Sequence, residues 1–197
     1  MTGRLVTCEG IDGSGKSTAA RSLVDELRAQ GRDARLHVEP TKTWLGESVR
    51  RAIREDVAPW TEALLFMADH ATHVGAVKGE IAQGALVVSD RWSDSTFAYQ
   101  GAALGDMGLL QRMEEPFDLR PDITLLFDLD PVVAMERVGR RGADQEKFER
   151  VDFLARVRAN YLRLAKADPQ RFVVLDAARP ADAVLKDALA AVLSRGA

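Results

Sequence analysis

The sequence contains very little cysteine and no long apolar run. Cys8 is the single cysteine among 197 residues, so no intrachain disulfide can form, and its apolar surroundings predict a buried, reduced thiol. No apolar run approaches the roughly 20 residues of a membrane span. The first residues, Met1 to Arg4, lack the apolar core of a signal peptide. These absences predict a cytoplasmic protein that takes no part in a membrane.

Positive charge is not in excess either. The chain has 27 Lys and Arg against 30 Asp and Glu, a formal net charge of -3, which argues against a broad surface for nucleic acid or lipid. An anionic ligand must therefore be held by local clusters of basic residues. Hydrophobic residues make up 46% of the chain, enough for a sizeable core, and no repeat, low-complexity tract or linker divides it. We expect a single domain over residues 1–197.

Short apolar runs alternate with longer amphipathic stretches, a pattern typical of a parallel sheet with helices on both faces. The predicted strands are Arg4–Glu9, Ala34–Val38, Ala85–Ser89, Ile123–Asp128 and Phe172–Leu175. The predicted helices are Lys16–Gln30, Leu45–Asp56, Trp60–Gln83, Asp106–Phe117, Pro131–Arg141, Glu149–Ala167 and Pro180–Ser194, with Pro131 and Pro180 in first turns and Asp130 as a cap. In such a sheet, ligands collect at the carboxyl ends of the strands.

A glycine loop joins the first strand to the first helix. Gly10 to Thr18 has the form GxxxxGKS, in which glycines let backbone N–H groups turn inward around an anion. The helix that follows adds the partial positive charge of its N-terminus. Lys16 is expected to reach the β- and γ-phosphates of a nucleotide, and the Ser17 hydroxyl to bind Mg²⁺. The alternative is a glycine-rich turn with an ordinary surface lysine, but the strand and helix context favours a P-loop NTPase fold.

Polar side chains also follow the second and third predicted strands. Glu39 comes directly after the second, and Asp90 and Arg91 end the third. An Asp at a strand end can hold Mg²⁺ while the adjacent Arg binds phosphate, although such an Asp is more often only a turn former. Together with the glycine loop, the pair favours the functional interpretation.

Basic residues gather near the end of the sixth predicted helix. Arg137, Arg140 and Arg141 lead into a glycine-containing segment that runs to Lys147. Such a run is often a solvated helix end, but phosphoryl transfer needs mobile positive charge that excludes water, so we expect a basic lid over about residues 137–149. After the last strand, the backbone at Ala177 is a candidate rest for a nucleotide base.

The helix that contains Glu62 to His70 gives weaker signals. Phe66 could belong to the core or could form a stacking platform for a base. His70 is one of three histidines, and a lone helical histidine is usually structural or solvated. Nothing in the sequence indicates a metal site built on histidine.

With these features together, the chain resembles the thymidylate kinase family of P-loop nucleoside monophosphate kinases, and in particular its archaeal-type branch. The resemblance covers nearly the whole chain. It is carried by Glu9–Thr18, Glu39–Pro40, Leu65–Asp69, Asp90–Arg91, Ser95–Gly101, Pro121–Asp128, Arg141–Gly142, Lys147–Glu149 and Phe153–Leu162.

The resemblance implies transfer of the ATP γ-phosphate to a pyrimidine deoxynucleoside monophosphate, with Mg²⁺ required. It implies a catalytic set of Lys16, Asp12, Asp90, Arg91, Arg137 and Arg141, with Ser17 and Asp90 at the metal. The implied ATP-binding residues are Gly10, Asp12, Gly13, Ser14, Gly15, Lys16, Ser17, Thr18, Arg140 and Ala177. The implied acceptor-binding residues are Glu39, Arg50, Phe66, His70, Arg91, Trp92, Ser95, Tyr99 and Gln100. It also implies small-molecule nucleotide substrates and a homodimer built on helices that include Trp60–Gln83.

Three positions depart from the family pattern. Val38 and His70 stand where many relatives have arginine, and Trp92 stands where they have tyrosine. Arginine offers a permanent charge and a fork of donors, whereas a neutral histidine offers one donor and one acceptor. The first hypothesis is therefore a thymidylate kinase, and the second is a kinase of the same fold for another or a modified pyrimidine monophosphate. A third is a P-loop protein that binds ATP as a conformational switch and transfers no phosphate.

Overall fold

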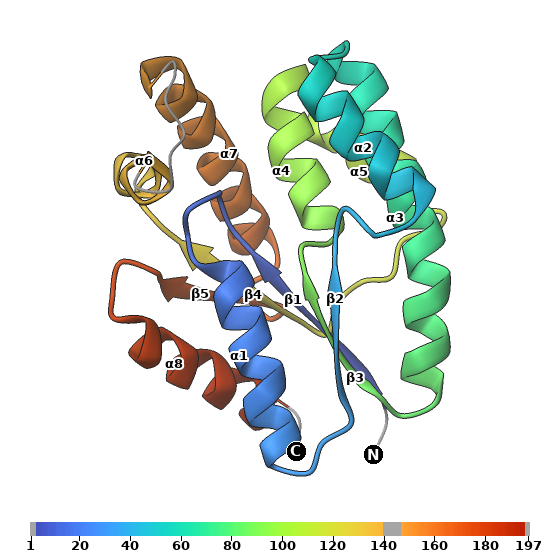
Figure 1. Cartoon of the computed structure of the whole chain (residues 1–197), viewed down its shortest axis with the longest axis vertical. Coiled ribbons are helices and arrows are strands. Elements are labelled where there is room, and N and C mark those ends of the chain that lie inside the picture. The colour runs from blue at the N-terminus through green and yellow to red at the C-terminus, as the bar shows by residue number, and fades with distance from the viewer. Residues whose placement is uncertain (1–2, 140–146, 196–197) are drawn as a thin grey trace.

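The computed structural model describes residues 3–139 and 147–195, and within them it forms a parallel five-stranded sheet with helices on both faces (Figure 1). The strands are β1 (Arg4–Glu9), β2 (Ala34–Val38), β3 (Leu86–Asp90), β4 (Ile123–Asp128) and β5 (Phe172–Asp176), in the spatial order β2-β3-β1-β4-β5. The expected α/β fold is confirmed, and each predicted strand lies within one residue of the observed bounds.

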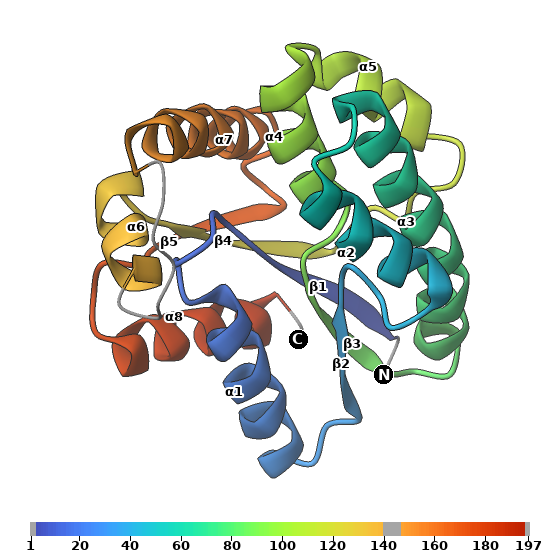
Figure 2. The ribbon, with the colours of Figure 1, turned by 45° about the horizontal axis from the view of Figure 1, so that its top comes forward.

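The helices form two layers. Helices α1 (Lys16–Ala29) and α8 (Ala181–Ser194) pack side by side on one face of the sheet (Figure 2). The other face carries α3 (Pro59–Ala82), α4 (Ser93–Leu104) and α7 (Lys147–Ala167). Helix α2 (Trp44–Glu55) packs on α3, α5 (Met107–Glu114) on α4, and α6 (Pro131–Gly139) on α7. None of the helices in the described ranges is both long enough and apolar enough to cross a bilayer.

The sheet supplies most of the core. Val6, Cys8, Val88, Leu125 and Phe127 are buried between the two helical layers. Because strands β1 and β4 are covered on both faces, they read as continuous apolar runs rather than as alternating patterns. The strand ends are thereby held in fixed register, with Cys8 opposite both Asp90 and Leu125.

Local signals explain several helix starts. Pro131 is the first residue of α6, and the Asp130 carboxylate accepts the Val132 N–H at 2.8 Å, as expected for a cap. The Asp106 carboxylate accepts the Leu109 N–H at 2.9 Å at the start of α5. Pro180 precedes the first turn of α8 rather than lying within it.

Helix α4 is the element that the sequence did not predict. Its residues include serine, threonine and glycine, which are weak helix formers, and eight of its twelve residues are buried. A helix buried on nearly every side has no apolar stripe, so its hydrophobic pattern carries no helical period. Helix α4 is therefore stabilised by the helices and strands around it, and it brings Ser95 and Tyr99 to the glycine loop.

Candidate active site

The glycine loop runs from the end of β1 to the start of α1, at the carboxyl edge of the sheet. Gly13 and Gly15 have φ values of 88° and 89°, in the left-handed region that suits glycine. A Cβ at Gly13 would lie 2.5 Å from the Ala134 carbonyl oxygen, whereas one at Gly15 would meet nothing within 4 Å. The loop is thus packed against α6 on one side and open on the other.

Lys16 lies within this loop, with only 4% of its surface exposed. Its Nζ lies 3.4 Å from the Ile11 carbonyl oxygen and 3.4 Å from Asp12 Oδ1, which are long contacts for a cation. Burial and the nearby Arg91 lower the pKa of Lys16 to about 8, against the opposite pull of Asp12. A buried, weakly paired ammonium is suited to an incoming phosphate, which would supply the missing negative charge.

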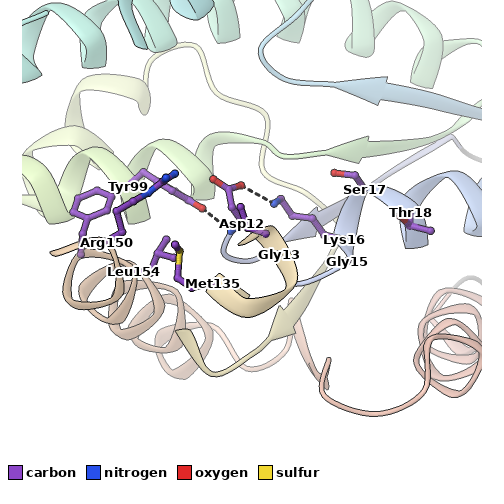
Figure 3. Close-up of a pocket in the computed structure, with 12 residues that line it drawn as sticks. Asp12, Gly13, Gly15, Lys16, Ser17, Thr18, Tyr99, Met135, Arg150 and Leu154 are labelled. Carbon is purple, nitrogen blue, oxygen red and sulfur yellow. Dashed lines mark hydrogen bonds and ion pairs between the residues drawn. The ribbon is translucent and has the colours of Figure 1, made fainter. Parts of the chain in front are cut away.

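A cavity of about 500 Å³ opens beside the loop (Figure 3). Its walls come from the loop and α1, from Tyr99 of α4, from Met135 and Val138 of α6, and from Arg150, Phe153 and Leu154 of α7. In Figure 3, Asp12 lies between Tyr99 and Lys16. The size is within the usual range for small-molecule sites. Six of the predicted ATP-binding residues line this cavity: Asp12, Gly13, Gly15, Lys16, Ser17 and Thr18.

Arg91 connects the glycine loop to α4. Its guanidinium forms an ion pair with Asp12 and donates to Ser95 Oγ at 3.1 Å, and it lies 5.0 Å from the centre of the Tyr99 ring. The Tyr99 hydroxyl in turn accepts the Asp12 N–H at 3.0 Å. Arg91 has a φ of 75°, which is uncommon for a side chain other than glycine. Four residues predicted from the sequence therefore meet at one point: Asp12, Arg91, Ser95 and Tyr99.

Glu9 lies beneath this group and is fully buried. Its carboxylate accepts from the Trp92 N–H at 2.7 Å, from Ser95 Oγ at 2.6 Å and from the Tyr161 hydroxyl at 2.9 Å. Burial and the charge of Asp94 raise the pKa of Glu9 to about 8. Sequence patterns alone assign no role to Glu9 or Tyr161, although both belong to motifs that carry the family resemblance.

Asp90 and Ser17 are the predicted metal ligands. Asp90 is 5% exposed, and its Oδ1 is buried without a hydrogen-bond partner among residues 3–139 and 147–195. A buried carboxylate oxygen without a partner is costly unless a cation or donor meets it. Mg²⁺ prefers oxygen ligands, and usually only a few of these ligands come from the protein. The Asp90 carboxylate and the Ser17 hydroxyl therefore suit Mg²⁺.

Other predicted acceptor residues come from the loop after β2 and from α2, α3 and α4. Glu39 follows β2, and its N–H donates to the Asp90 carbonyl oxygen at 3.1 Å. Phe66 is half-buried, so its ring retains some open surface. The Gln100 amide donates to Glu62 Oε1 at 2.9 Å. Arg50 donates to the carbonyl oxygens of Pro40 and Thr41, at 3.0 and 2.6 Å, and so supports the loop after β2.

Two of the acceptor residues are buried more deeply than the sequence suggested. Trp92 is 0% exposed, and its indole N–H donates to the Leu119 carbonyl oxygen at 2.8 Å. His70 is 1% exposed, and both of its ring nitrogens are used, with Nδ1 2.8 Å from Glu39 Oε1 and Nε2 2.8 Å from Asp118 Oδ1. In this arrangement neither ring offers a free polar atom to a base, so direct base contacts by His70 and Trp92 stay predictions.

The charges around His70 support one another. Burial opposes the charged form of Glu39, but His70 and His73 outweigh it and lower the pKa of Glu39 to about 2. Burial likewise opposes the protonated ring of His70, but Glu39 and Asp118 raise its pKa well above the ordinary value. At neutral pH, His70 is therefore an imidazolium between two carboxylates.

A second cavity, of about 380 Å³, lies on the far side of the glycine loop. Ser14, Gly15 and Thr18 form one wall, and Ala177, Arg179 and the start of α8 form another. Arg137 donates to the Ala177 carbonyl oxygen at 3.1 Å, so two predicted donor-side residues meet here. The other predicted lid arginines, Arg140 and Arg141, lie outside the described residues.

Comparison with known proteins agrees with this geometry. Residues 8–188 match the family model described as thymidylate kinase. A protein of Methanococcoides burtonii named "Probable thymidylate kinase" is 45% identical over 98% of each chain. Proteins of the same name from Methanosarcina mazei and Methanoculleus marisnigri are 44% and 47% identical, over 98% and 92% of this chain and 97% and 90% of their own.

Proposed function

The chain belongs to the thymidylate kinase family, and we propose that it transfers the γ-phosphoryl group of ATP to dTMP, giving dTDP and ADP. One observation carries the proposal beyond the family. The buried ammonium of Lys16 and the Asp12–Arg91 pair lie against the same glycine loop, so a phosphate donor and a phosphate acceptor can approach each other there.

The reaction needs positioning rather than a covalent enzyme intermediate. An oxygen of the dTMP phosphate attacks the γ-phosphorus, and the bond from that phosphorus to the oxygen bridging the β-phosphate breaks, leaving ADP. Lys16 would neutralise charge on the β- and γ-phosphates, and Arg91 would hold the acceptor phosphate. Bound Mg²⁺, held by Ser17 and Asp90, would neutralise further charge on the donor phosphates. Asp12 would orient Arg91 through their ion pair.

The two cavities suit the two ends of the donor. The 500 Å³ cavity is lined by the glycine loop and suits phosphates. The 380 Å³ cavity has more apolar walls, from Phe127, Val184 and Leu185, and suits the adenine base against the backbone near Ala177. Arg137 would reach the site from α6, and Arg140 and Arg141 would add charge from the lid.

On the acceptor side, Phe66 would stack on the base, and Ser95, Tyr99 and Gln100 would line the pocket. A kinase for another or a modified pyrimidine monophosphate remains the second candidate. The observation that favours it is that His70 has no nitrogen free for a base edge, where an arginine would offer five donors. Neutral groups would then recognise the base.

The test is ADP production from Mg·ATP with dTMP, dUMP, 5-substituted dUMP analogues, dCMP, UMP and dGMP. A clear preference for dTMP supports the proposal, and a preference for another pyrimidine supports the second candidate. Nucleotide binding without ADP production in the presence of any acceptor would contradict both kinase hypotheses and would favour an ATP-binding switch.

We also propose a cytoplasmic homodimer in which α3 contributes to the interface. Trp60 and Leu64 of α3 are 42% and 51% exposed, and Trp44 of the adjoining α2 is 75% exposed, which is unusual for large apolar side chains. Light scattering of the purified chain should give twice the monomer mass. Leu64→Glu should reduce that mass to one chain without unfolding the protein; a dimer that survives this substitution would place the interface elsewhere.

A further inference from the structure

All three histidines of the chain lie in one hydrogen-bonded series with three carboxylates. Successive contacts of 2.8, 2.8, 2.7, 2.7 and 3.0 Å join the members of this histidine chain, in the order Asp118, His70, Glu39, His73, His37 and Glu80. Its members come from β2, α3 and the segments after β2 and α5. A series that contains every histidine of the protein has a countable number of protons.

The inner members of the histidine chain are buried, and its outer members reach the surface. His70, His73 and Glu39 are 1%, 7% and 8% exposed, whereas the side chains of His37 and Glu80 are 18% and 27% exposed. The Trp92 ring covers the inner part, with its centre 4.6 Å from that of His70 and 5.1 Å from that of His73. The side chain of Asp118, at the other end, is 20% exposed, so both ends of the histidine chain reach solvent while its inner members do not.

Counting protons fixes the charge of the His37–His73 pair. An ionised carboxylate only accepts, so His73 Nδ1 must carry a proton toward Glu39, and His37 Nε2 must carry one toward Glu80. The 2.7 Å contact between His37 Nδ1 and His73 Nε2 needs a third proton. Two neutral rings supply only two, so the pair holds one extra proton that the rings share.

The same count applied to His70 gives an imidazolium. Both of its nitrogens face carboxylates and both must donate. The three rings thus hold five protons where neutral rings would hold three, and two positive charges lie among the three carboxylates.

Glu39 connects the histidine chain to the proposed active site. Its backbone N–H donates to the carbonyl of Asp90, a proposed metal ligand, and its Oε1 accepts from both His70 and His73. We propose that His73 is a positioning residue for Glu39 on the acceptor side, and that it donates this hydrogen bond while sharing a proton with His37. The proposal rests on the proposed function for its link to the acceptor nucleotide, but the shared proton does not depend on it.

Charged groups lie on both sides of the shared proton. Glu39 and His70 lie on the inner side, Glu80 lies on the outer side, and Arg35 of β2 lies 3.7 Å from Glu80. Glu114 and Asp118 face His70 from α5 and the segment after it.

The kinetic test compares His73→Leu, His73→Asn and His37→Leu. His73→Leu removes the donor to Glu39 and should raise KM for dTMP about tenfold with kcat changed less than twofold, because a hydrogen bond to a charged group is lost. His73→Asn retains an N–H near the position of Nδ1 and should restore KM to within twofold of wild type. His37→Leu leaves the inner donor in place and should keep KM at pH 7 near wild type.

The matched control is Thr72→Val, at the exposed neighbour of His73 on α3, whose hydroxyl donates to the Ala68 carbonyl oxygen at 3.2 Å. It should leave KM for dTMP unchanged. An equal KM for wild type, His73→Leu and His73→Asn, all folded by their melting temperatures, would overturn the positioning role. So would a rise in KM in His73→Leu that His73→Asn fails to reverse.

The protons themselves are tested without any substrate. Long-range ¹H–¹⁵N correlation spectra of ¹⁵N-histidine protein at pH 6.5 should show four fully protonated ring nitrogens and two intermediate signals, from His37 Nδ1 and His73 Nε2, which share the fifth proton. His37→Leu should convert His73 to a neutral ring that keeps its Nδ1 proton. Neutral His37 and His73 in the wild-type protein would overturn proton sharing.

The two proposals fail in different ways. If wild type does not phosphorylate or bind dTMP, the proposed function and the link from His73 to the acceptor both fall, while the spectra still decide the shared proton. If wild type phosphorylates dTMP and the His73 variants behave alike, only the positioning role falls.

Discussion

Replacing Gly13 and Gly15 by alanine, one at a time, would test how the glycine loop is held. The two residues have nearly the same φ values, 88° and 89°, so both substitutions carry left-handed strain. They differ in their surroundings, because only the Cβ at position 13 would meet the backbone of α6, 2.5 Å from the Ala134 carbonyl oxygen. The pair therefore separates strain from contact.

The expected costs follow from these two terms. Left-handed strain is about 1–2 kcal/mol for an L-residue, and the lower entropy of the unfolded alanine chain returns about 0.4–1 kcal/mol. Gly15→Ala should thus reduce the free energy of unfolding by about 1 kcal/mol. Gly13→Ala adds forced movement of α6 or of the loop, for which overpacking gives about 1–3 kcal/mol more.

Urea unfolding of both variants, with m-values compared to wild type, measures this difference. Because α6 carries Arg137, Gly13→Ala should also weaken Mg·ATP binding in titration calorimetry. Equal costs for the two variants, within about 0.5 kcal/mol, would refute the argument that the loop packs firmly against α6.

Three further results are expected. Lys16→Ala should lower kcat by about 100-fold or more in a steady-state ADP assay, because it removes a preorganised cation. Its melting temperature should stay near that of wild type. A near-normal kcat would contradict the role assigned to Lys16. Arg91→Ala should raise KM for dTMP more than KM for ATP, and the opposite pattern would move Arg91 to the donor side. Mg·ATP binding near pH 8 should take up roughly half a proton, because free Lys16 has a pKa of about 8 and bound phosphate would raise that pKa. Calorimetry in buffers of different ionisation enthalpy measures this uptake. Uptake that persists in Lys16→Ala would assign the proton elsewhere.

Much of the fold could be predicted because its signals are local. The strands are short apolar runs bounded by Gly, Pro or Asp, and the glycine loop identifies the first strand and helix by its spacing alone. Helix α4 could not be found in this way, since its helical state is decided by burial from several sides rather than by its own residues. The lesson applies to the site too, because α4 carries Ser95 and Tyr99.

The residues of the candidate site differ in the same way, because some are placed by local geometry and others by contacts between distant parts of the sequence. Residues within one motif, such as Lys16 and Ser17, or at a strand end, such as Asp90, were predictable because one local geometry places them. The contacts of Glu9 with Tyr161 join residues 152 apart in the chain, and no spacing rule connects them. The predicted lid arginines Arg140 and Arg141 lie outside the described residues, so their role stays a prediction.

His70 shows why a substitution has to be judged with its neighbours. From the sequence, histidine in place of arginine looks like a weaker donor to the base. In the structure, both of its N–H groups are directed at Glu39 and Asp118, and its raised pKa comes from those carboxylates. Its charge fixes the loop after β2 to the segment after α5 instead of facing the acceptor pocket. Under the proposed function, stacking on Phe66 and neutral groups such as Gln100 must then select the base, and that selection should depend little on salt because no permanent charge contributes to it.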